Sequence, residues 1–150
     1  MRWRNLVLFL AERESRLPLL PGNTLLIGDV SFQHDSNGLL LLRERPGQPP
    51  VTIVVVNNGM FGTIRAHQER RFPDRPHGTD LVNPDFVAMA EAIGFTAFRV
   101  RETTEISDAF DRALKHDGPA LVELVLDPEA ISTRASLSKI RTDAKARQSS

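Results

Sequence analysis

Two short polar pairs in the sequence stand directly after apolar runs, and both offer oxygen ligands. Gly28-Asp29 follows residues 24–27, and Asn57-Asn58 follows residues 51–56. Glycine permits a tight turn, Asp29 offers a hard anionic oxygen, and Asn58 offers a neutral amide oxygen. One carboxylate and one amide suit Mg²⁺, which usually keeps phosphate and water ligands as well. Ser31 adds a hydroxyl near an expected helix start, where an anion is favoured. These residue types therefore indicate a magnesium–diphosphate site.

The same residues also fit a simpler interpretation as turns. Gly-Asp ends many strands, and Asn57-Asn58-Gly59 is a common turn sequence. Taken without further context, the residues favour the turn over the metal site.

The hydrophobic pattern around these pairs predicts strands and helices in alternation. Residues 51–56 are β-branched and nearly all apolar, which is typical of a strand covered on both faces in a parallel sheet. Asn83 is expected to cap a helix that begins with Pro84 and that Gly94 closes. The expected strands are 24–27, 51–56, 96–100 and 120–125. The expected helices are 3–13, 61–71, 84–93, one that includes 39–43, and one with an apolar stripe at 106–114 that stops at Gly118-Pro119.

This alternation predicts an α/β fold, with a parallel sheet, helices on both of its faces and right-handed crossovers. Ligands of such sheets bind beyond the carboxyl ends of the strands, which is where both polar pairs stand. We expect a helix and linker over residues 1–22, a ligand-binding domain over 23–127, and a polar tail over 128–150 that frays beyond Arg141.

Composition narrows the range of partners. The 150 residues hold 19 Lys and Arg against 19 Asp and Glu, so no charge excess attracts nucleic acid or an anionic membrane. The absence of cysteine excludes disulfides, thiolate metal sites and cysteine nucleophiles, and it suits the cytoplasm. The apolar run at residues 5–11 is too short to span a bilayer, and charged residues follow it at once. We expect a cytoplasmic protein that binds neither nucleic acid nor membrane.

The two polar pairs together resemble the motif of thiamine-diphosphate-dependent enzymes, which begins Gly-Asp-x-Ser and ends Asn-Asn. Asn58 lies 29 residues after Asp29, slightly further than usual, and the turn at 46–50 can hold the excess. Val30 stands where the family usually has glycine. The resemblance covers about residues 23–141. It implies the thiamine-diphosphate-binding fold of the carboxyl-terminal domain, truncated on its N-terminal side.

Different stretches of the chain resemble two different branches of this superfamily. Residues 57–65, 78–86 and 119–124 are similar to acetolactate-synthase-like enzymes. Residues 28–42 are similar to the menaquinone-pathway 2-succinyl-5-enolpyruvyl-6-hydroxy-3-cyclohexene-1-carboxylate synthase. The resemblance implies a thiamine diphosphate and Mg²⁺-binding domain of a 2-oxo-acid decarboxylase or carboligase. The menaquinone-pathway synthase and a non-catalytic fragment or assembly module stay open as alternatives.

The resemblance also implies roles for individual residues. The side chains of Asp29 and Asn58 and the backbone carbonyl of Met60 would bind Mg²⁺. The activating glutamate would come from a pyrimidine-binding domain, earlier in the chain or in a partner subunit, so a homo- or hetero-oligomer is expected. No catalytic residue is assigned within this chain. The residues implied to contact the cofactor are Gly28, Asp29, Val30, Ser31, Asn58, Met60 and Phe61.

Other polar residues give weaker signals. His34 follows the motif closely and could lie near the substrate, whereas the other histidines fit surface or loop positions. Four arginines between residues 65 and 75 could hold a substrate carboxylate, although a solvated face explains them more simply.

Overall fold

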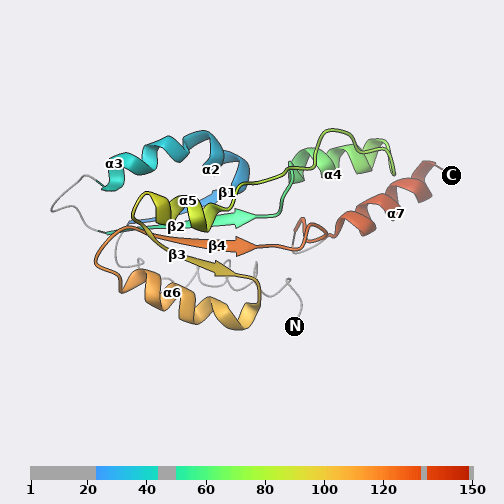
Figure 1. Cartoon of the computed structure of the whole chain (residues 1–150). Coiled ribbons are helices and arrows are strands. Elements are labelled where there is room, and N and C mark those ends of the chain that lie inside the picture. Colours follow the sequence, from blue (N-terminus) through green and yellow to red (C-terminus); the bar gives the residue numbers. More distant parts are fainter. Residues whose placement is uncertain (1–22, 44–49, 133–134, 149–150) are drawn as a thin grey trace. The chain divides into compact units, whose positions relative to one another are not determined.

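A computed structural model describes residues 23–43, 50–132 and 135–148 (Figure 1). The helix expected at residues 3–13 lies outside these ranges. The described residues form two compact units, the sheet unit (23–57 and 83–125) and the helix-pair unit (58–82 and 126–148). No described helix is both long enough and apolar enough to cross a membrane.

The sheet unit is built on four parallel strands, as the apolar runs predict. β2 lies between β1 and β4, and its central residues are buried on both faces, which explains the continuous β-branched run at 51–56. The strands are β1 (Asn23–Gly28), β2 (Val51–Asn57), β3 (Thr96–Val100) and β4 (Ala120–Val125), in the sheet order β1-β2-β4-β3.

Helices cover both faces of this sheet, which confirms the predicted fold class (Figure 1). On one face, Phe32 and Phe86 meet edge to face with ring centroids 5.2 Å apart, above Ile53 and Leu121. The opposite face packs against α6, where the Arg112 guanidinium lies over a strand aromatic ring. The helical segments are α2 (Asp29–Asp35), η1 (Ser36–Gly38), α3 (Leu39–Arg43), α5 (Phe86–Ala92), η2 (Thr103–Glu105) and α6 (Ile106–Leu114).

The start of α5 corrects one prediction. Asn83 does not cap this helix; Asp85 does, because its Oδ1 accepts a hydrogen bond of 2.9 Å from the Ala88 backbone N–H. The Asn83 side chain instead donates hydrogen bonds to residues far away in the sequence. At the other end, Gly94 has a φ of +88° and closes the helix as expected.

The helix-pair unit corrects a second prediction, the frayed tail. α4 (Gly62–Arg71) was expected, but α7 (Leu137–Gln148) continues well past Arg141. Leu137 and Ile140 bury their side chains in a small apolar cluster with Met60. These apolar positions are spaced for one helical face, and they stabilise α7 although charged residues surround them.

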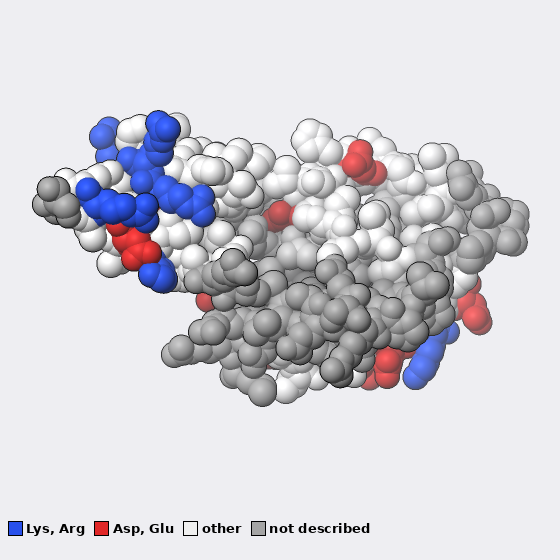
Figure 2. Space-filling view, turned by 180° about the vertical axis from the view of Figure 1, so that it is seen from behind, with Lys and Arg blue, Asp and Glu red and all other residues white. Residues whose placement is uncertain are grey.

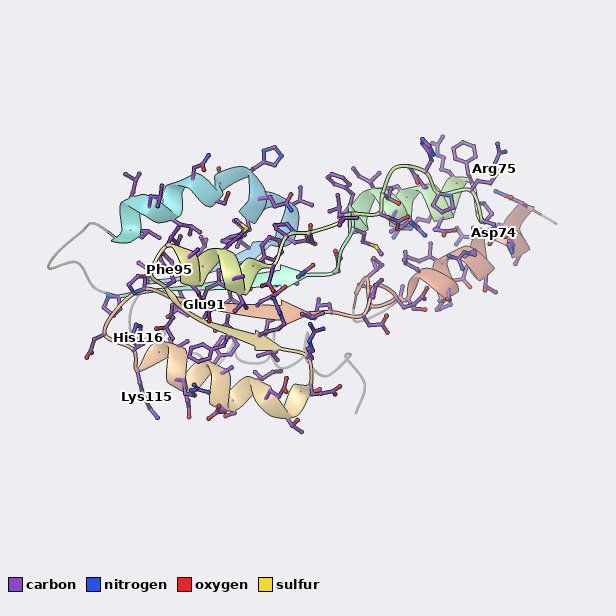
Figure 3. The ribbon with its side chains drawn as sticks, viewed as in Figure 1. Asp74, Arg75, Glu91, Phe95, Lys115 and His116 are labelled. Carbon is purple, nitrogen blue, oxygen red and sulfur yellow. The ribbon has the colours of Figure 1, made fainter. Side chains whose placement is uncertain are left out.

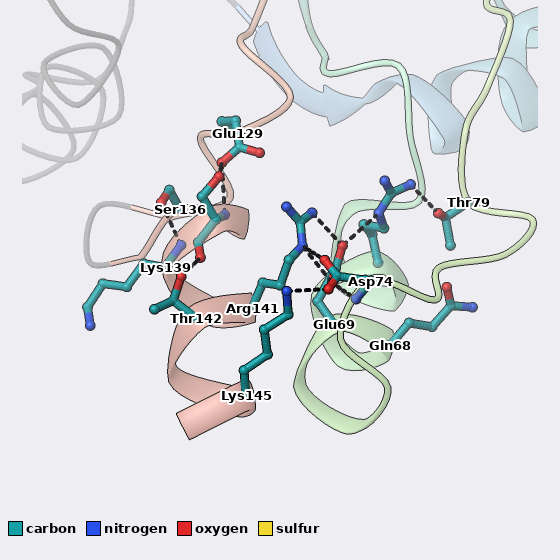
Figure 4. A network of polar contacts seen from close by, with 12 residues as sticks. Gln68, Glu69, Asp74, Thr79, Glu129, Ser136, Lys139, Arg141, Thr142 and Lys145 are labelled. Atoms are coloured by element: carbon teal, nitrogen blue, oxygen red, sulfur yellow. Dashed lines mark hydrogen bonds and ion pairs between the residues drawn. The ribbon is translucent and has the colours of Figure 1, made fainter. Parts of the chain in front are cut away.

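A buried ion pair also fixes α7 to α4 (Figure 4). The Glu69 side chain is fully buried, and its two oxygens accept hydrogen bonds of 3.0 and 2.6 Å from Nε and Nη2 of Arg141. The Asp74 backbone N–H donates a further bond of 3.1 Å to Glu69, and Lys145 pairs with the Asp74 carboxylate. The Arg141 guanidinium holds the pKa of the Glu69 carboxyl below its ordinary value of 4.5.

Removing this guanidinium should weaken the helix pair. Arg141→Ala leaves a buried carboxylate without its bidentate partner and should lower the unfolding free energy by about 2 kcal/mol near neutral pH. Since the folded pKa of Glu69 is depressed, its stabilisation is present above pH 4.5 and is lost as pH falls below that value. Urea unfolding of the wild type between neutral pH and pH values below 4.5 should show this loss, and Arg141→Ala should show less of it.

Lys139→Ala is the matched control, because Lys139 pairs with Asp143 on the exposed side of the same helix. It should change the unfolding free energy by less than about 0.5 kcal/mol. Equal destabilisation by the two variants would contradict the role of the buried pair.

Candidate functional site

The carboxyl ends of β1 and β2 bring the first polar pair beside the first asparagine. Gly28 pairs with Val56 in the parallel register, so Asp29 and Asn57 are the next residues on neighbouring strands. Asp29 begins α2 and is only 4% exposed. A buried carboxylate therefore lies at the edge of the sheet where ligands of parallel α/β folds bind.

Backbone and side-chain N–H groups hold the Asp29 carboxylate. Its Oδ1 accepts a hydrogen bond of 2.9 Å from the Val30 backbone N–H, and its Oδ2 accepts one of 2.8 Å from Asn83 Nδ2. The same Asn83 nitrogen donates to Asn57 Oδ1, also at 2.8 Å. Asn83 thus links the ends of β1 and β2 through one amide group.

The contacts continue from Asn57 into the sheet. Asn57 Nδ2 donates to Glu123 Oε1 at 2.7 Å, and Arg99 Nε donates to Glu123 Oε2 at 2.7 Å. Arg99 also pairs with Asp85, the cap of α5. We call these residues the polar network: Asp29, Asn83, Asn57, Glu123, Arg99 and Asp85.

Electrostatics within the network agree with its geometry. The hydrogen bonds to Glu123 and Asp85 raise the pKa of the Arg99 guanidinium. The Ala88 backbone N–H, and after it Arg99, lower the pKa of the Asp85 carboxyl. The buried Glu123 is 2% exposed and receives a charged donor, which a carboxylate in the core requires.

Strand periodicity places this network on one face of the sheet. Asn57 is two residues after Val55, and Glu123 is two residues after Leu121. Side chains two residues apart on a strand share a face. Val55 and Leu121 belong to the apolar cluster beneath α2 and α5. The core of this face therefore changes from apolar to polar toward the carboxyl ends of the strands.

The other predicted cofactor-contacting residues near Asp29 are Gly28, Val30 and Ser31, at the carboxyl end of β1 and the start of α2. Among the residues that the structure describes, no heavy atom beyond the chain neighbours lies within 4 Å of the position that a Cβ on Gly28 would occupy. Val30 is half-buried in α2, and Ser31 and His34 are exposed there. No described side chain therefore blocks close approach of a ligand to the Gly28 backbone.

The second half of the predicted site lies in the helix-pair unit. Asn58 follows the last residue of β2, and its Oδ1 accepts a hydrogen bond of 3.2 Å from the Met60 backbone N–H. Gly59 has a φ of +65°, a left-handed conformation that favours glycine. The turn interpretation of this sequence is therefore right about its local geometry. Met60 is buried, and Phe61 is half-buried directly before α4.

Gly62 leaves space for the Asn58 amide. A Cβ at Gly62 would lie 2.9 Å from Asn58 Nδ2, closer than side chains normally approach. The absence of a side chain at this position therefore allows the observed Asn58 orientation. This requirement is independent of any ligand.

The arginines do not form one group. Arg65 was expected on a solvated face, but it is half-buried and donates at 2.9 Å to both Thr79 Oγ1 and Asp80 Oδ1. Arg70, Arg71 and Arg75 are exposed, as the solvated interpretation predicts. On the face that Figure 2 shows, Lys and Arg gather over the helix-pair unit. None of these contacts indicates a carboxylate-binding pocket.

Histidine contributes to structure at the other end of the sheet. His116 Nε2 lies 3.0 Å from Thr96 Oγ1, at the amino end of β3 (Figure 3). Within the described ranges, no three His, Cys, Asp or Glu residues stand where they could hold a metal together. A cation bound by the described residues would therefore need neutral oxygens beside a carboxylate.

Sequence reasoning missed most of the polar network. A carboxylate at position 123 inside an apolar strand was the one available signal, because a buried charge needs a partner. Asn83 gave a competing signal as a helix cap next to Pro84. For Asn57, the sequence predicts only a place in the Asn-Asn pair, with no partner in the sheet.

The buried glutamate should matter for stability. Glu123→Ala removes the acceptor of Asn57 and the buried partner of Arg99, so the unfolding free energy should fall by about 3 kcal/mol. Denaturant unfolding measures this change. Glu91→Ala is the matched control, since Glu91 is an exposed residue of α5 (Figure 3), and it should stay within about 0.5 kcal/mol of wild type. Similar losses in the two variants would refute the structural role of Glu123.

Comparison with curated proteins finds acetolactate synthases and a related synthase. The chain is 32% identical over 101 residues to the acetolactate synthase isozyme 2 large subunit of Escherichia coli, covering 67% of this chain and 18% of that protein. It is 33% identical over 103 residues to the 2-succinyl-5-enolpyruvyl-6-hydroxy-3-cyclohexene-1-carboxylate synthase of Listeria monocytogenes, covering 67% and 17%. The chain thus spans less than a fifth of the length of either relative.

A solved structure and a family profile agree with these similarities. The thiamine diphosphate-dependent 4-hydroxybenzoylformate decarboxylase of Rhodococcus jostii aligns with a TM-score of 0.62 and 30% identity, over 69% of this chain and 19% of that one. Residues 23–124 match the profile of the family described as thiamine pyrophosphate enzyme, C-terminal TPP binding domain. Thiamine pyrophosphate and thiamine diphosphate are the same compound. The chain therefore belongs to the family of C-terminal thiamine-diphosphate-binding domains.

Proposed function

We propose that this chain holds the diphosphate of thiamine diphosphate through Mg²⁺, as part of a 2-oxo-acid decarboxylase or carboligase of the acetolactate-synthase type. The proposed metal ligands are the Asp29 and Asn58 side chains and the Met60 backbone carbonyl. The observation that supports this most is a buried Asp29 at the carboxyl edge of the parallel sheet, inside the family match over residues 23–124.

The chemistry of the donor set fits a magnesium–diphosphate group. Asp29 offers one hard anionic oxygen ligand, and Asn58 and Met60 offer neutral oxygens. Carboxylates that bind metals commonly accept hydrogen bonds at the same time, as Asp29 does from Val30 and Asn83. Open space beside Gly28 allows a phosphate to approach the backbone. Phosphate oxygens and water would complete the octahedron that Mg²⁺ prefers.

The residues of this chain would bind and orient rather than perform the chemical step. Thiamine diphosphate supplies, when bound, the carbanion and electron-sink chemistry needed for loss of CO₂ from a 2-oxo acid. The Asp29 carboxylate would help to neutralise and fix the diphosphate end through the metal. Gly28, Val30 and Ser31 would line the diphosphate, with Phe61 close to the cofactor.

Activity should need a second domain. The chain spans less than a fifth of the relatives that it matches, and no glutamate in it is assigned the activating role. We propose that a pyrimidine-binding domain or subunit supplies this glutamate, from a longer chain or from a partner in a homo- or hetero-oligomer. The enzyme class, transferase or lyase, depends on that complete assembly.

A second candidate activity has its own support. The Listeria synthase shares 33% identity with this chain and the Escherichia coli enzyme 32%, each over 67% of the chain, and residues 28–42 resemble the Listeria branch. Turnover of 2-oxoglutarate with isochorismate, compared with turnover of pyruvate, separates the two activities once the partner domain is present. A chain that binds no cofactor would instead be a non-catalytic fragment or assembly module.

Calorimetric titration with thiamine diphosphate tests the proposed function. Binding should require Mg²⁺ and be abolished by EDTA, and Asp29→Ala and Asn58→Ala should each weaken it by more than about tenfold, since even outer partners of metal ligands contribute about 10–100-fold. Asp35→Ala, an exposed aspartate of α2, is the matched control and should bind like wild type. No heat at millimolar cofactor, or wild-type binding by both ligand variants, would contradict the proposal.

A further inference from the structure

The two amides of the polar network, Asn57 and Asn83, lie between the carboxylates of Glu123 and Asp29, which determine how the amides are oriented. A carboxylate can only accept hydrogen bonds, so an amide beside it must present its nitrogen. Glu123 therefore turns Asn57 so that Nδ2 faces it, at 2.7 Å. This leaves Asn57 Oδ1 facing Asn83, whose Nδ2 donates to it at 2.8 Å.

With one amide hydrogen of Asn83 bonded to Asn57, the second points to Asp29. The same Nδ2 donates to Asp29 Oδ2 at 2.8 Å, so its two hydrogens point to the ends of two neighbouring strands. The Asn83 carbonyl oxygen accepts a hydrogen bond of 3.2 Å from Gln33 Nε2 in α2. Every polar atom of this side chain is thus used, although Asn83 lies outside any helix or strand.

We propose that Asn83 is a positioning residue for the cation, which fixes the Asp29 carboxylate in the orientation that binds Mg²⁺, and that Glu123 sets this orientation through Asn57. The proposal rests on the proposed function of Asp29. The proposal gives the two adjacent asparagines different roles. The Asn57 side chain connects Glu123 to Asn83 by hydrogen bonds, and Asn58 is the proposed Mg²⁺ ligand.

The physical gain is preorganisation. A carboxylate that is held before the metal arrives does not lose rotational freedom on binding, and its hydrogen-bond partner also fixes which oxygen faces the ion. Such outer partners contribute about 10–100-fold to metal affinity. A purely structural Asn83 would instead affect folding without changing the affinity for Mg²⁺.

Asn83→Ala tests the positioning role in the complete protein. The readout is the Mg²⁺ concentration that gives half-maximal binding of thiamine diphosphate, followed by calorimetry or cofactor fluorescence, with unfolding measured separately. This concentration should rise by about 10–100-fold. Saturating Mg²⁺ should restore most of the cofactor affinity, because the ligands themselves are intact. Asn37→Ala, an exposed asparagine in η1, is the matched control and should keep the wild-type Mg²⁺ dependence.

Glu123→Gln provides a second variant that keeps the side-chain shape. One glutamine oxygen cannot replace both carboxylate oxygens that accept from Asn57 and Arg99. The side-chain amides of Asn57 and Asn83 are then no longer held in the orientation that places Asn83 Nδ2 against Asp29. The required Mg²⁺ concentration should rise in the same direction as for Asn83→Ala. If Asn83→Ala does not fold, this variant decides the question alone.

The outcomes distinguish the two proposals. A wild-type protein that binds no thiamine diphosphate in the presence of Mg²⁺ refutes the proposed function, and the positioning role with it. A wild-type protein that binds, together with folded Asn83→Ala and Glu123→Gln variants of unchanged Mg²⁺ dependence, refutes the positioning role alone.

Discussion

The parallel register of β1 and β2 is the constraint on which the sheet unit depends. Pairing of Gly28 with Val56 places the next residues, Asp29 and Asn57, at the same edge of the sheet. Parallel strands can meet this way only when helical crossovers cover the sheet, and covered strands must be apolar. The continuous apolar run of β2 therefore does more than build the core, because it also aligns two polar strand ends. The proposed binding chemistry follows from this alignment.

Among the described residues, one glutamate is buried in each unit, Glu69 in the helix-pair unit and Glu123 in the sheet unit. The surroundings of these two carboxylates differ. Glu69 is bound by Arg141 and fixes α7 to α4, so its contacts end within the helix pair. Glu123 is bound by Arg99 on one oxygen and by the Asn57 amide on the other. A buried charge is costly unless it is paired, so both glutamates require their arginines. Of these two glutamates, only Glu123 is connected to Asp29 at the edge of the sheet. The connection runs through the side-chain amides of Asn57 and Asn83, each of which is held in one orientation.

The sequence was sufficient for the features that depend on local pattern. The apolar run at 51–56, the glycine at 94 and the Gly-Asp and Asn-Asn strand ends predicted the parallel sheet, the end of α5 and the position of Asp29. Asn83 was misassigned because two capping residues, Asn83 and Asp85, stand close together before the helix. Asp85 caps α5, and Asn83 donates instead to Asp29, 54 residues away, a contact that a local rule cannot include. α7 was missed for a similar reason, since its apolar positions are meaningful only against Met60 and α4.

The most direct measurement is a crystal structure of the protein with thiamine diphosphate and Mn²⁺ in place of Mg²⁺, in which anomalous scattering locates the ion. We expect an ion bound to an Asp29 carboxylate oxygen and to the Asn58 amide oxygen, with Asn83 still donating to Asp29. An ion whose ligands do not include Asp29, or an Asn83 side chain turned away from the carboxylate, would contradict it.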